Sequence, residues 1–299
     1  MKGKNKLIFL LLMFFSTTFF SLCYAATLDE ILKKGELRHL GVPYANFVTG
    51  LGDGFSVELI KGFCKELGVK YVYVKTSWET VISDLTGKAI EVKGGKVKVI
   101  GKVPIKGDLI ANGLTKLPWR ETLINYSDPV LPTQVLLVAS IDSPLKVVQK
   151  TSNIKTDIKN VIRQLNGITI LGKTGTCIDK DLYDLDNVDV KFINFPGNLN
   201  DLIPAIIRKK ASATLLDLPD VLIALSKWPG KIKIIGPVSE EQVMGVGFTK
   251  DATKLQEKFN AYLKKIKANG IYYELVMKYF PLILQYYPDF FIDVKRFNQ

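Results

Sequence analysis

The sequence predicts an α/β protein whose strands and helices fall into two successive sets. Short apolar or alternating runs, typical of strands, take turns with amphipathic runs, typical of helices, along almost the whole chain. The first set ends with a strand at 108–111, and the second begins with one at 135–139. With 299 residues, 47% of them hydrophobic, the chain is long enough to bury one or two cores. The β-α-β order predicts mostly parallel sheets with helices on both faces.

The first 25 residues have the composition of a signal peptide. A lysine-rich start precedes an apolar stretch from Leu7 to Phe20, and Cys23-Tyr24-Ala25 fits a small-x-small cleavage site. We therefore expect export and cleavage near Ala26, with a retained membrane anchor as the alternative. Leu22 is too large for a good lipidation signal. No later stretch of about 18 apolar residues exists, so we expect a soluble mature protein.

The charge pattern argues against nucleic acid as a partner. The formal net charge is +12, and loss of the three lysines in the leader leaves +9 on the mature chain. These lysines are spread out, and no cluster of arginines and aromatic residues interrupts them, so we expect a solvated basic surface. Such a surface favours anionic ligands or a membrane surface.

The first set has clear local signals. In chain order it is predicted as helix 28–34, strand 36–42, helix 55–67, strand 69–75, helix 78–85 and strand 108–111. The second helix carries Cys64 on its apolar side, as a core residue, and ends at Gly68. Residues 69–75 alternate and are rich in Val and Tyr, as strands are. Ser77 is a natural N-cap for the third helix.

One segment interrupts this alternation. Residues 90–93 and 96–99 form two alternating arms around Gly94-Gly95, which predicts a β-hairpin with a two-residue turn. Its polar face carries lysines and should be solvated. The hairpin is either an addition to the fold without a role in binding or a docking surface for a partner.

The second set continues the alternation. Its predicted strands are 135–139, 168–171, 188–193, 211–216, 232–235 and 243–248, and its predicted helices are 157–165, 198–208, 252–268 and 272–280. A glycine-rich turn, Gly172 to Thr176, is expected to lead into a further helix. Asn198 is expected to cap its helix. The tail, 281–299, is aromatic and irregular.

The strand at 108–111 points to a binding site. It delivers Gly113 and Thr115 at its carboxyl end, where open α/β sheets bind ligands. Arg120 follows after one short turn, and its planar fork can hold a carboxylate in two places. The pattern favours a site for a small carboxylic acid; a surface arginine on a short helix is the alternative.

Other chemistries lack their residues. His39 is the only histidine, and Cys64 and Cys177 are too far apart in the sequence to form a ligand cluster, so we expect no metal or cofactor. We expect no disulfide between these cysteines, although exported proteins permit one. Gly172-Lys173-Thr174 lacks the earlier glycine of a phosphate loop.

The order of motifs resembles the bacterial extracellular solute-binding proteins of family 3, the amino-acid receptors of ABC transporters. The matching stretches are 28–31 with 34–38, 54–59, 76–78, Gly113-x-Thr115 with Arg120 and 126–129, 172–177, and Asp217 after 213–216. The sequence departs from the family pattern at Asn46, Ser56 and Cys177.

This resemblance implies a two-lobed periplasmic-binding-protein-like fold of type II, with two hinge strands. Lobe 1 would comprise 26–131 and 241–299, with a hairpin insertion at about 89–106 and the tail at about 281–299. Lobe 2 would comprise 132–240, and 1–25 would be the signal peptide. The resemblance also implies a periplasmic monomer that is not an enzyme and that serves a membrane permease.

The resemblance implies roles for particular residues. Arg120 would pair with a ligand carboxylate, Thr115 would add a donor, and the Gly113 carbonyl and Asp217 would accept from an ammonium group. Further ligand contacts would come from the backbone of Thr176 and Cys177, from Lys173, and from the walls Tyr44, Phe47 and Trp78. Three of these have simpler readings, because Asp217 could cap the next helix, Trp78 could be core and Lys173 could be solvated.

Two other functions remain open. A prephenate-type dehydratase on this fold would need a cleft carboxylate as general acid, with Glu58, Glu79 and Asp217 as candidates. A receptor without a transporter, which senses a ligand or binds a cell-wall fragment, is the other. We expect binding of a small carboxylate, an amino acid above all, rather than catalysis.

Overall fold

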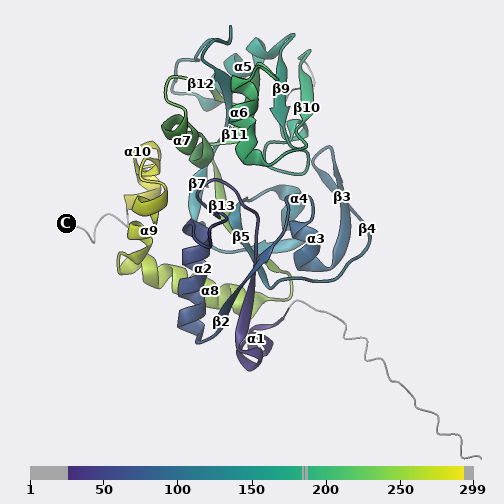
Figure 1. The fold of residues 1–299 in the computed structure, drawn as a ribbon, viewed down its shortest axis with the longest axis vertical. Coiled ribbons are helices and arrows are strands. Elements are labelled where there is room, and N and C mark those ends of the chain that lie inside the picture. Colours follow the sequence, from purple (N-terminus) through teal and green to yellow (C-terminus); the bar gives the residue numbers. More distant parts are fainter. Residues whose placement is uncertain (1–25, 184, 186–187, 293–299) are drawn as a thin grey trace, which may run out of the picture.

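The computed structural model describes residues 26–183, 185 and 188–292 and has two α/β lobes, one above the other (Figure 1). The expected two-lobed α/β class is confirmed. The predicted signal peptide, 1–25, lies outside the described residues. Within the described part of the chain, no helix is long and apolar enough to cross a membrane.

The lower lobe in Figure 1 is built on a six-stranded sheet. Its strand order is β2 (Lys70–Lys75), β1 (Glu36–Gly41), β5 (Leu109–Thr115), β13 (Gln242–Thr249) and β6 (Ile124–Tyr126), with β7 (Leu131–Thr133) also paired to β13. Its helices are α1 (Leu28–Lys34), α2 (Phe55–Leu67), α3 (Val81–Thr86), α4 (Pro118–Glu121), α8 (Thr253–Ala268), α9 (Ile271–Tyr279) and α10 (Ile283–Tyr286). A 3-10 helix, Asp289–Phe291, follows α10.

The upper lobe is built on a five-stranded sheet. Its strand order is β10 (Lys191–Asn194), β9 (Thr169–Gly172), β11 (Ala213–Asp217), β8 (Val135–Ser140) and β12 (Ile232–Pro237). Its α-helices are α5 (Ile154–Ile162), α6 (Leu202–Ile207) and α7 (Leu218–Lys227), and its 3-10 helices are Arg163–Leu165, Lys180–Leu182 and Leu199–Asp201.

Both sheets are mixed, whereas the sequence suggested mostly parallel ones. In each sheet the first three strands are parallel, and the remaining pairs are antiparallel. The reason in the lower lobe is that β13 comes late in the chain and runs antiparallel to β5, β6 and β7. The exact lobe limits at 131 and 241 stay a prediction.

Local signals position the first elements. Thr27 and Glu30 form a capping box at the start of α1, and Gly35 ends the helix in the left-handed conformation. Gly68 ends α2 in the same way, as predicted. Asn198 accepts the backbone N–H of Asn200 and so caps the short helix before α6, also as predicted.

The third helix starts later than predicted. It begins at Val81 rather than Trp78, and Thr80, not Ser77, occupies its N-cap position. The Thr76 and Thr80 hydroxyls both donate to the buried carboxylate of Asp84, at 2.5 and 3.0 Å. These side-chain bonds hold the entry to the helix as a turn.

The hairpin prediction is confirmed. Strands β3 (Lys88–Lys93) and β4 (Lys96–Lys102) pair in antiparallel fashion. Gly94 and Gly95 join them with φ of 58° and 65°, the positive values that a two-residue hairpin turn requires. The hairpin rises from the lower lobe beside α3 towards the upper lobe (Figure 1).

The tail is more ordered than expected. Residues 283–286 and 289–291 are helical, and Phe291 is fully buried, 6.4 Å from the ring of Tyr272. The remainder of the tail, 293–299, lies outside the described residues.

Candidate functional site

Arg120 lies buried between the lobes. It sits on α4, which Pro118 starts directly after β5, and only 1% of it is exposed. Its guanidinium donates to the carbonyl of Thr115 at 3.0 Å and, across the lobes, to the carbonyl of Gly175 at 3.3 Å. Its Nε has no hydrogen-bond partner. Its guanidinium also lies 5.2 Å from the centre of the Trp119 ring, and among the described residues no carboxylate forms an ion pair with it.

The strand before Arg120 offers further unused polar groups. The Thr115 hydroxyl and both amide atoms of Asn112 are buried and have no partner among the described residues. Buried polar groups are normally hydrogen-bonded, so such exceptions call for an explanation. Asn112 was not identified from the sequence, where an amide inside an apolar strand was the available signal.

Asp217 approaches from the other lobe, at the end of β11. Its carboxylate accepts from the Cys177 thiol at 2.9 Å, from the Thr133 hydroxyl at 3.2 Å and from the Tyr44 hydroxyl at 3.5 Å. Although Asp217 is the N-cap residue of α7, its side chain makes no capping bond. The capping alternative is therefore wrong. Burial raises the pKa of Asp217, and the surrounding donors oppose that rise.

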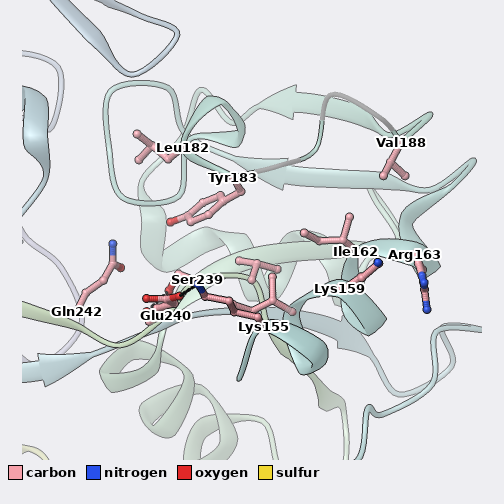
Figure 2. A pocket seen from close by; sticks show the side chains of 12 residues that line it. Lys155, Lys159, Ile162, Arg163, Leu182, Tyr183, Val188, Ser239, Glu240 and Gln242 are labelled. Carbon is pink, nitrogen blue, oxygen red and sulfur yellow. Dashed lines mark hydrogen bonds and ion pairs between the residues drawn. The ribbon is translucent and has the colours of Figure 1, made fainter. Parts of the chain in front are cut away.

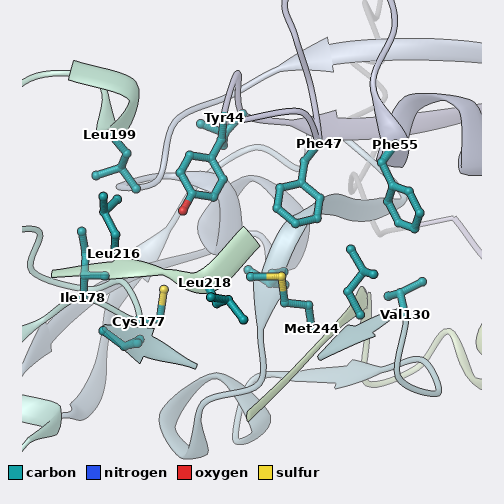
Figure 3. Close-up of a cluster of buried hydrophobic side chains, with 14 of the residues drawn as sticks. Tyr44, Phe47, Phe55, Val130, Cys177, Ile178, Leu199, Leu216, Leu218 and Met244 are labelled. Carbon is teal, nitrogen blue, oxygen red and sulfur yellow. The ribbon is translucent and has the colours of Figure 1, made fainter. Parts of the chain in front are cut away.

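The aromatic residues divide between the site and the core. Tyr44 directs its hydroxyl towards the part of the cluster that contains Cys177 and Leu216 (Figure 3), and Trp78 meets its ring edge-on at 5.5 Å. Phe47 stacks on Tyr44 at 6.0 Å and also packs on Phe280 at 4.7 Å.

Gly113 shows why Phe47 belongs to the core. A Cβ at this glycine would lie 2.6 Å from the Phe47 ring, and its φ of +73° favours glycine as well. The ring of Phe47 thus backs the strand on which Gly113 and Thr115 lie.

The turn at 172–177 differs from the prediction. No α-helix begins at Thr176 or Cys177, and the next helical residues are Lys180–Leu182. Instead the Asp179 carboxylate accepts from the Gly175 N–H at 2.9 Å, and the Thr176 hydroxyl donates to the Lys173 carbonyl at 2.7 Å. Because these side chains satisfy the turn locally, the expected anion site at a helix N-terminus is absent from these residues.

Lys173 joins the lobes. It is 6% exposed, so the solvated alternative is wrong. Its ammonium lies 2.7 Å from the Glu79 carboxylate of the lower lobe and donates to the carbonyls of Phe195 and Gly197 at 3.2 and 3.4 Å. Burial acts to raise the pKa of Glu79, but hydrogen bonds from Lys173 and Ser77 outweigh it, and the pKa is lowered.

The lobes are closed on each other around these residues. The Ala45 N–H donates to the Asn200 side chain at 2.9 Å, and the Asn198 side chain donates to the Pro43 carbonyl at 3.4 Å. With the contacts of Tyr44 and Arg120, these bonds close the gap between the two halves.

A second acid, Asp220, lies one helical turn after Asp217. Burial and the neighbouring charge of Asp217 raise its pKa to about 7. Asp220 was not among the site residues predicted from the sequence, although an acidic residue within an apolar helical segment was a signal for a buried carboxylate.

Among the described residues, the cysteines Cys64 and Cys177 are both free and buried, and they lie in different lobes. Burial raises the pKa of Cys64 to about 12, and burial together with the nearby charge of Asp217 raises that of Cys177. In the described part of the chain, no group of three or more His, Cys, Asp or Glu residues could hold a metal. The expectation of no metal or cofactor stays a prediction.

A pocket of about 850 Å³ lies elsewhere, on the upper lobe (Figure 2). It is bounded by α5, by Leu182 and Tyr183, and by residues 238–240. None of the predicted site residues lines it. It adjoins the site through Tyr183, whose hydroxyl donates to the Cys177 carbonyl, and through Gln242, which is paired with Thr133 across β13 and β7.

Comparisons with known proteins agree with this architecture. A crystal structure of a mutant of ArgBP from T. maritima is similar with a TM-score of 0.66 and 26% identity, covering 85% of this chain and 99% of that one. The ancestral amino acid-binding protein AncCDT-1, a precursor of cyclohexadienyl dehydratase, is similar with a TM-score of 0.67 and 23% identity, covering 85% and 100%.

The same family emerges from sequence comparison. The arginine-binding extracellular protein ArtP of Bacillus subtilis (strain 168) is 22% identical over 260 residues, which are 84% of this chain and 88% of ArtP. The pattern described as "Bacterial extracellular solute-binding proteins, family 3" matches residues 105–282, more than half of the chain. The chain therefore belongs to the bacterial extracellular solute-binding proteins of family 3.

Proposed function

We propose that this chain is an exported, monomeric binding protein that captures a small carboxylate ligand, an amino acid above all, between its lobes and delivers it to the permease of an ABC transporter. One observation supports this most directly. Arg120 and Asp217, a base and an acid, are buried on opposite lobes and form no ion pair within the described residues.

A zwitterion would neutralise both groups. Isolated buried charges are costly because they lose their hydration without a counter-charge. The α-carboxylate would take the Arg120 fork, including the unused Nε, and the unused Thr115 hydroxyl. The α-ammonium would lie at the Asp217 carboxylate and the Gly113 carbonyl, and Thr176 and Cys177 would contact the ligand from the upper lobe.

The side chain of the ligand is the finer part of the proposal. ArtP is named for arginine, and ArgBP of T. maritima was solved in an arginine-bound form. In this chain Tyr44 and Trp78 would wall the side-chain end. Lys173, already paired with Glu79, would sit at its rim and would disfavour a cationic side chain unless that pair opened.

Closure would follow from a shift in population. A ligand drives closure only by the difference between its affinities for the closed and open forms. Here it would replace the contact of Tyr44 with Asp217 and that of Arg120 with Gly175 by bonds to both lobes at once. Micromolar affinity corresponds to about −8 kcal/mol.

Thermal-shift screening of residues 26–299 against the amino acids and small dicarboxylates tests the proposal. One class should raise the melting temperature by selective binding to the native state. Arg120→Ala should abolish that rise, and Arg120→Lys should keep only part of it because the fork is lost. If the ligand raises the melting temperature of Arg120→Ala as much as that of the parent protein, Arg120 does not bind the ligand.

One observation supports a dehydratase as the second candidate. Asp220, whose pKa lies at about 7, has the property of a general acid, and AncCDT-1 is a precursor of a dehydratase. Prephenate would be the substrate to test, with turnover followed by ultraviolet absorbance. We expect none, because Asp220 is buried and already interacts with Asp217 and Tyr44. If the protein does turn over prephenate and Asp220→Asn loses that activity, the dehydratase would be favoured over the binding protein.

A receptor that serves a sensor instead of a transporter would use the same site. Reconstitution with a candidate permease separates the two, since stimulation of its ATPase activity by the loaded protein is expected only for a transport partner.

A further inference from the structure

The β3–β4 hairpin belongs to the lower lobe, but its tip rests on the upper one. The backbone N–H of Gly94, at the turn, donates to the Asp181 carboxylate at 3.0 Å. A Cβ at Gly95 would lie 3.3 Å from the Leu182 side chain. The hairpin therefore bridges the two lobes beside the site (Figure 1).

The underside of the hairpin is apolar where it meets this junction. Val92 and Val97 are directly paired across the two strands, so they share a face. Both are half-buried and pack on the core, as Leu182 does from the upper lobe. The next pair along the ladder, Glu91 with Lys98, is exposed and faces away from that contact.

The charges at the tip favour the same contact. The Asp181 carboxylate pairs with Lys180 at 2.7 Å and accepts from Gly94. These hydrogen bonds, with Lys93 nearby, lower the pKa of Asp181. The acid on the upper lobe thus meets a basic hairpin tip.

The contact continues into the candidate site. The Asp181 N–H donates to Asp179 at 3.2 Å, and Asp179 in turn holds the Gly175 N–H. The Gly175 carbonyl accepts from Arg120. A Cβ at Gly175 would lie 4.0 Å from Val92, so the hairpin covers the turn that Arg120 reaches.

We propose that the β3–β4 hairpin is a strap that holds the two lobes together in the closed form, before any ligand is bound. The hairpin contacts act between the lobes themselves, so the strap goes beyond the proposed function and does not depend on which ligand the site takes.

The experiment measures the distance between the lobes without ligand. Spin labels at Lys258→Cys on α8 and Lys159→Cys on α5, both exposed positions on different lobes, report the separation by pulsed electron resonance. The native Cys64 and Cys177 are buried and are replaced by alanine in all samples, including the reference. The reference protein should show mainly the short distance of the closed form.

Two variants remove the strap in different ways. In the first, residues 90–100 are replaced by Asn-Gly, a two-residue turn between the paired residues Ala89 and Gly101. In the second, Asp181→Ala removes the acceptor of Gly94 and leaves the hairpin in place. The matched control is Glu91→Ala, which removes the same charge from the outward face of β3.

The shortened hairpin should move most molecules to longer distances. Asp181→Ala should raise the ratio of open to closed molecules by about three- to tenfold, the range expected for one hydrogen bond to a carboxylate near the surface. Glu91→Ala should match the reference. If neither variant changes the distance distribution, the strap proposal is refuted. The proposed amino-acid site is tested separately, by the thermal-shift screen. If the shortened chain fails to fold, Asp181→Ala against Glu91→Ala decides alone.

Discussion

The half-buried Arg38 and the buried Arg120 contrast a cation paired within the protein with one that we propose binds a ligand. Arg38 donates to the Asp108 carboxylate through Nε at 3.2 Å and Nη2 at 2.6 Å, and its own backbone N–H bonds the same acid at 2.8 Å. Arg120 donates to two carbonyls, lies 5.2 Å from the centre of the Trp119 ring and has an unused Nε. Arg38 has its counter-charge in Asp108, whereas no carboxylate among the described residues forms an ion pair with Arg120.

Loss of the cation should reduce stability strongly at position 38 and barely at position 120. Arg38→Met leaves the buried Asp108 carboxylate without its counter-charge and should lower the free energy of unfolding by about 3–5 kcal/mol. Arg120→Met relieves an unpaired buried charge and should change the stability of the empty protein by less than about 1 kcal/mol, while ligand binding is lost. Urea unfolding of both variants, with and without ligand, checks this. A large loss in empty Arg120→Met would mean that its role is structural.

Asp220 makes stability depend on pH. Its pKa is about 7 in the folded protein, whereas an exposed aspartate titrates near 3.9, so the folded state holds more protons between these values. The contribution of protonated Asp220 to the free energy of unfolding is therefore complete below about pH 4, and it is lost as the pH rises to about 7.

The isosteric change Asp220→Asn should remove this dependence. The variant should be more stable than the parent protein at pH 8, by a few kcal/mol at most, and the two should converge near pH 4. Melting temperatures measured from pH 4 to pH 8 provide the readout. A parallel course of the two curves would show that Asp220 does not titrate in this range.

At the scale of elements, β5 and its flanking turn position the site. The strand carries Gly113 and Thr115 to its carboxyl end, and Pro118 starts α4 so that Arg120 turns back to the Thr115 carbonyl. The ring of Phe47 presses on the strand from behind at Gly113.

Replacing Gly113 should therefore be more costly than its backbone angle alone implies. Gly113→Ala adds a clash with the Phe47 ring to the strain of positive φ, and we expect a loss of about 2–4 kcal/mol of unfolding free energy. Gly35→Ala is the matched control, with φ of +71° and no atom within 4 Å of its Cβ, and should cost about 1 kcal/mol. If Gly113→Ala and Gly35→Ala lose equal amounts of unfolding free energy, the clash with Phe47 does not contribute.

Elements with their signals inside their own sequence were predicted well. The limits of α1 and α2 agree with the sequence prediction because Thr27, Gly35 and Gly68 cap them locally. The start of α3 and the turn after β9 were predicted wrongly. Their geometry depends on the Asp84 and Asp179 carboxylates, whose bonds compete with helix formation.

At the scale of the whole molecule, the two cysteines provide reporters of lobe opening. Cys177 lies at the lobe junction, where its thiol donates to Asp217, whereas Cys64 lies on the buried face of α2 in the core of the lower lobe. Opening of the lobes exposes the first and leaves the second buried.

Thiol labelling should therefore separate opening from unfolding. In Cys64→Ala, Cys177 should react slowly, and faster when the hairpin is shortened; in Cys177→Ala, Cys64 should react only at the rate of global unfolding. Reaction with Ellman's reagent, followed at 412 nm, measures both. Equal rates for the two thiols would show that Cys177 is not exposed by lobe opening.

The α/β class, the order of strands and helices, the hairpin and the place of Arg120 on a short helix after β5 could all be read from the sequence, because each depends on neighbouring residues and their periodicity. The partners of Arg120, Asp217 and Lys173 could not be read in this way. Asp217 accepts from Thr133 and Tyr44, 84 and 173 positions away, and Lys173 pairs with Glu79. The contact of the hairpin with Asp181 likewise joins residues 87 positions apart. Such pairings arise only when the two lobes close, because packing of whole lobes, not local preference, brings these charges within hydrogen-bonding distance.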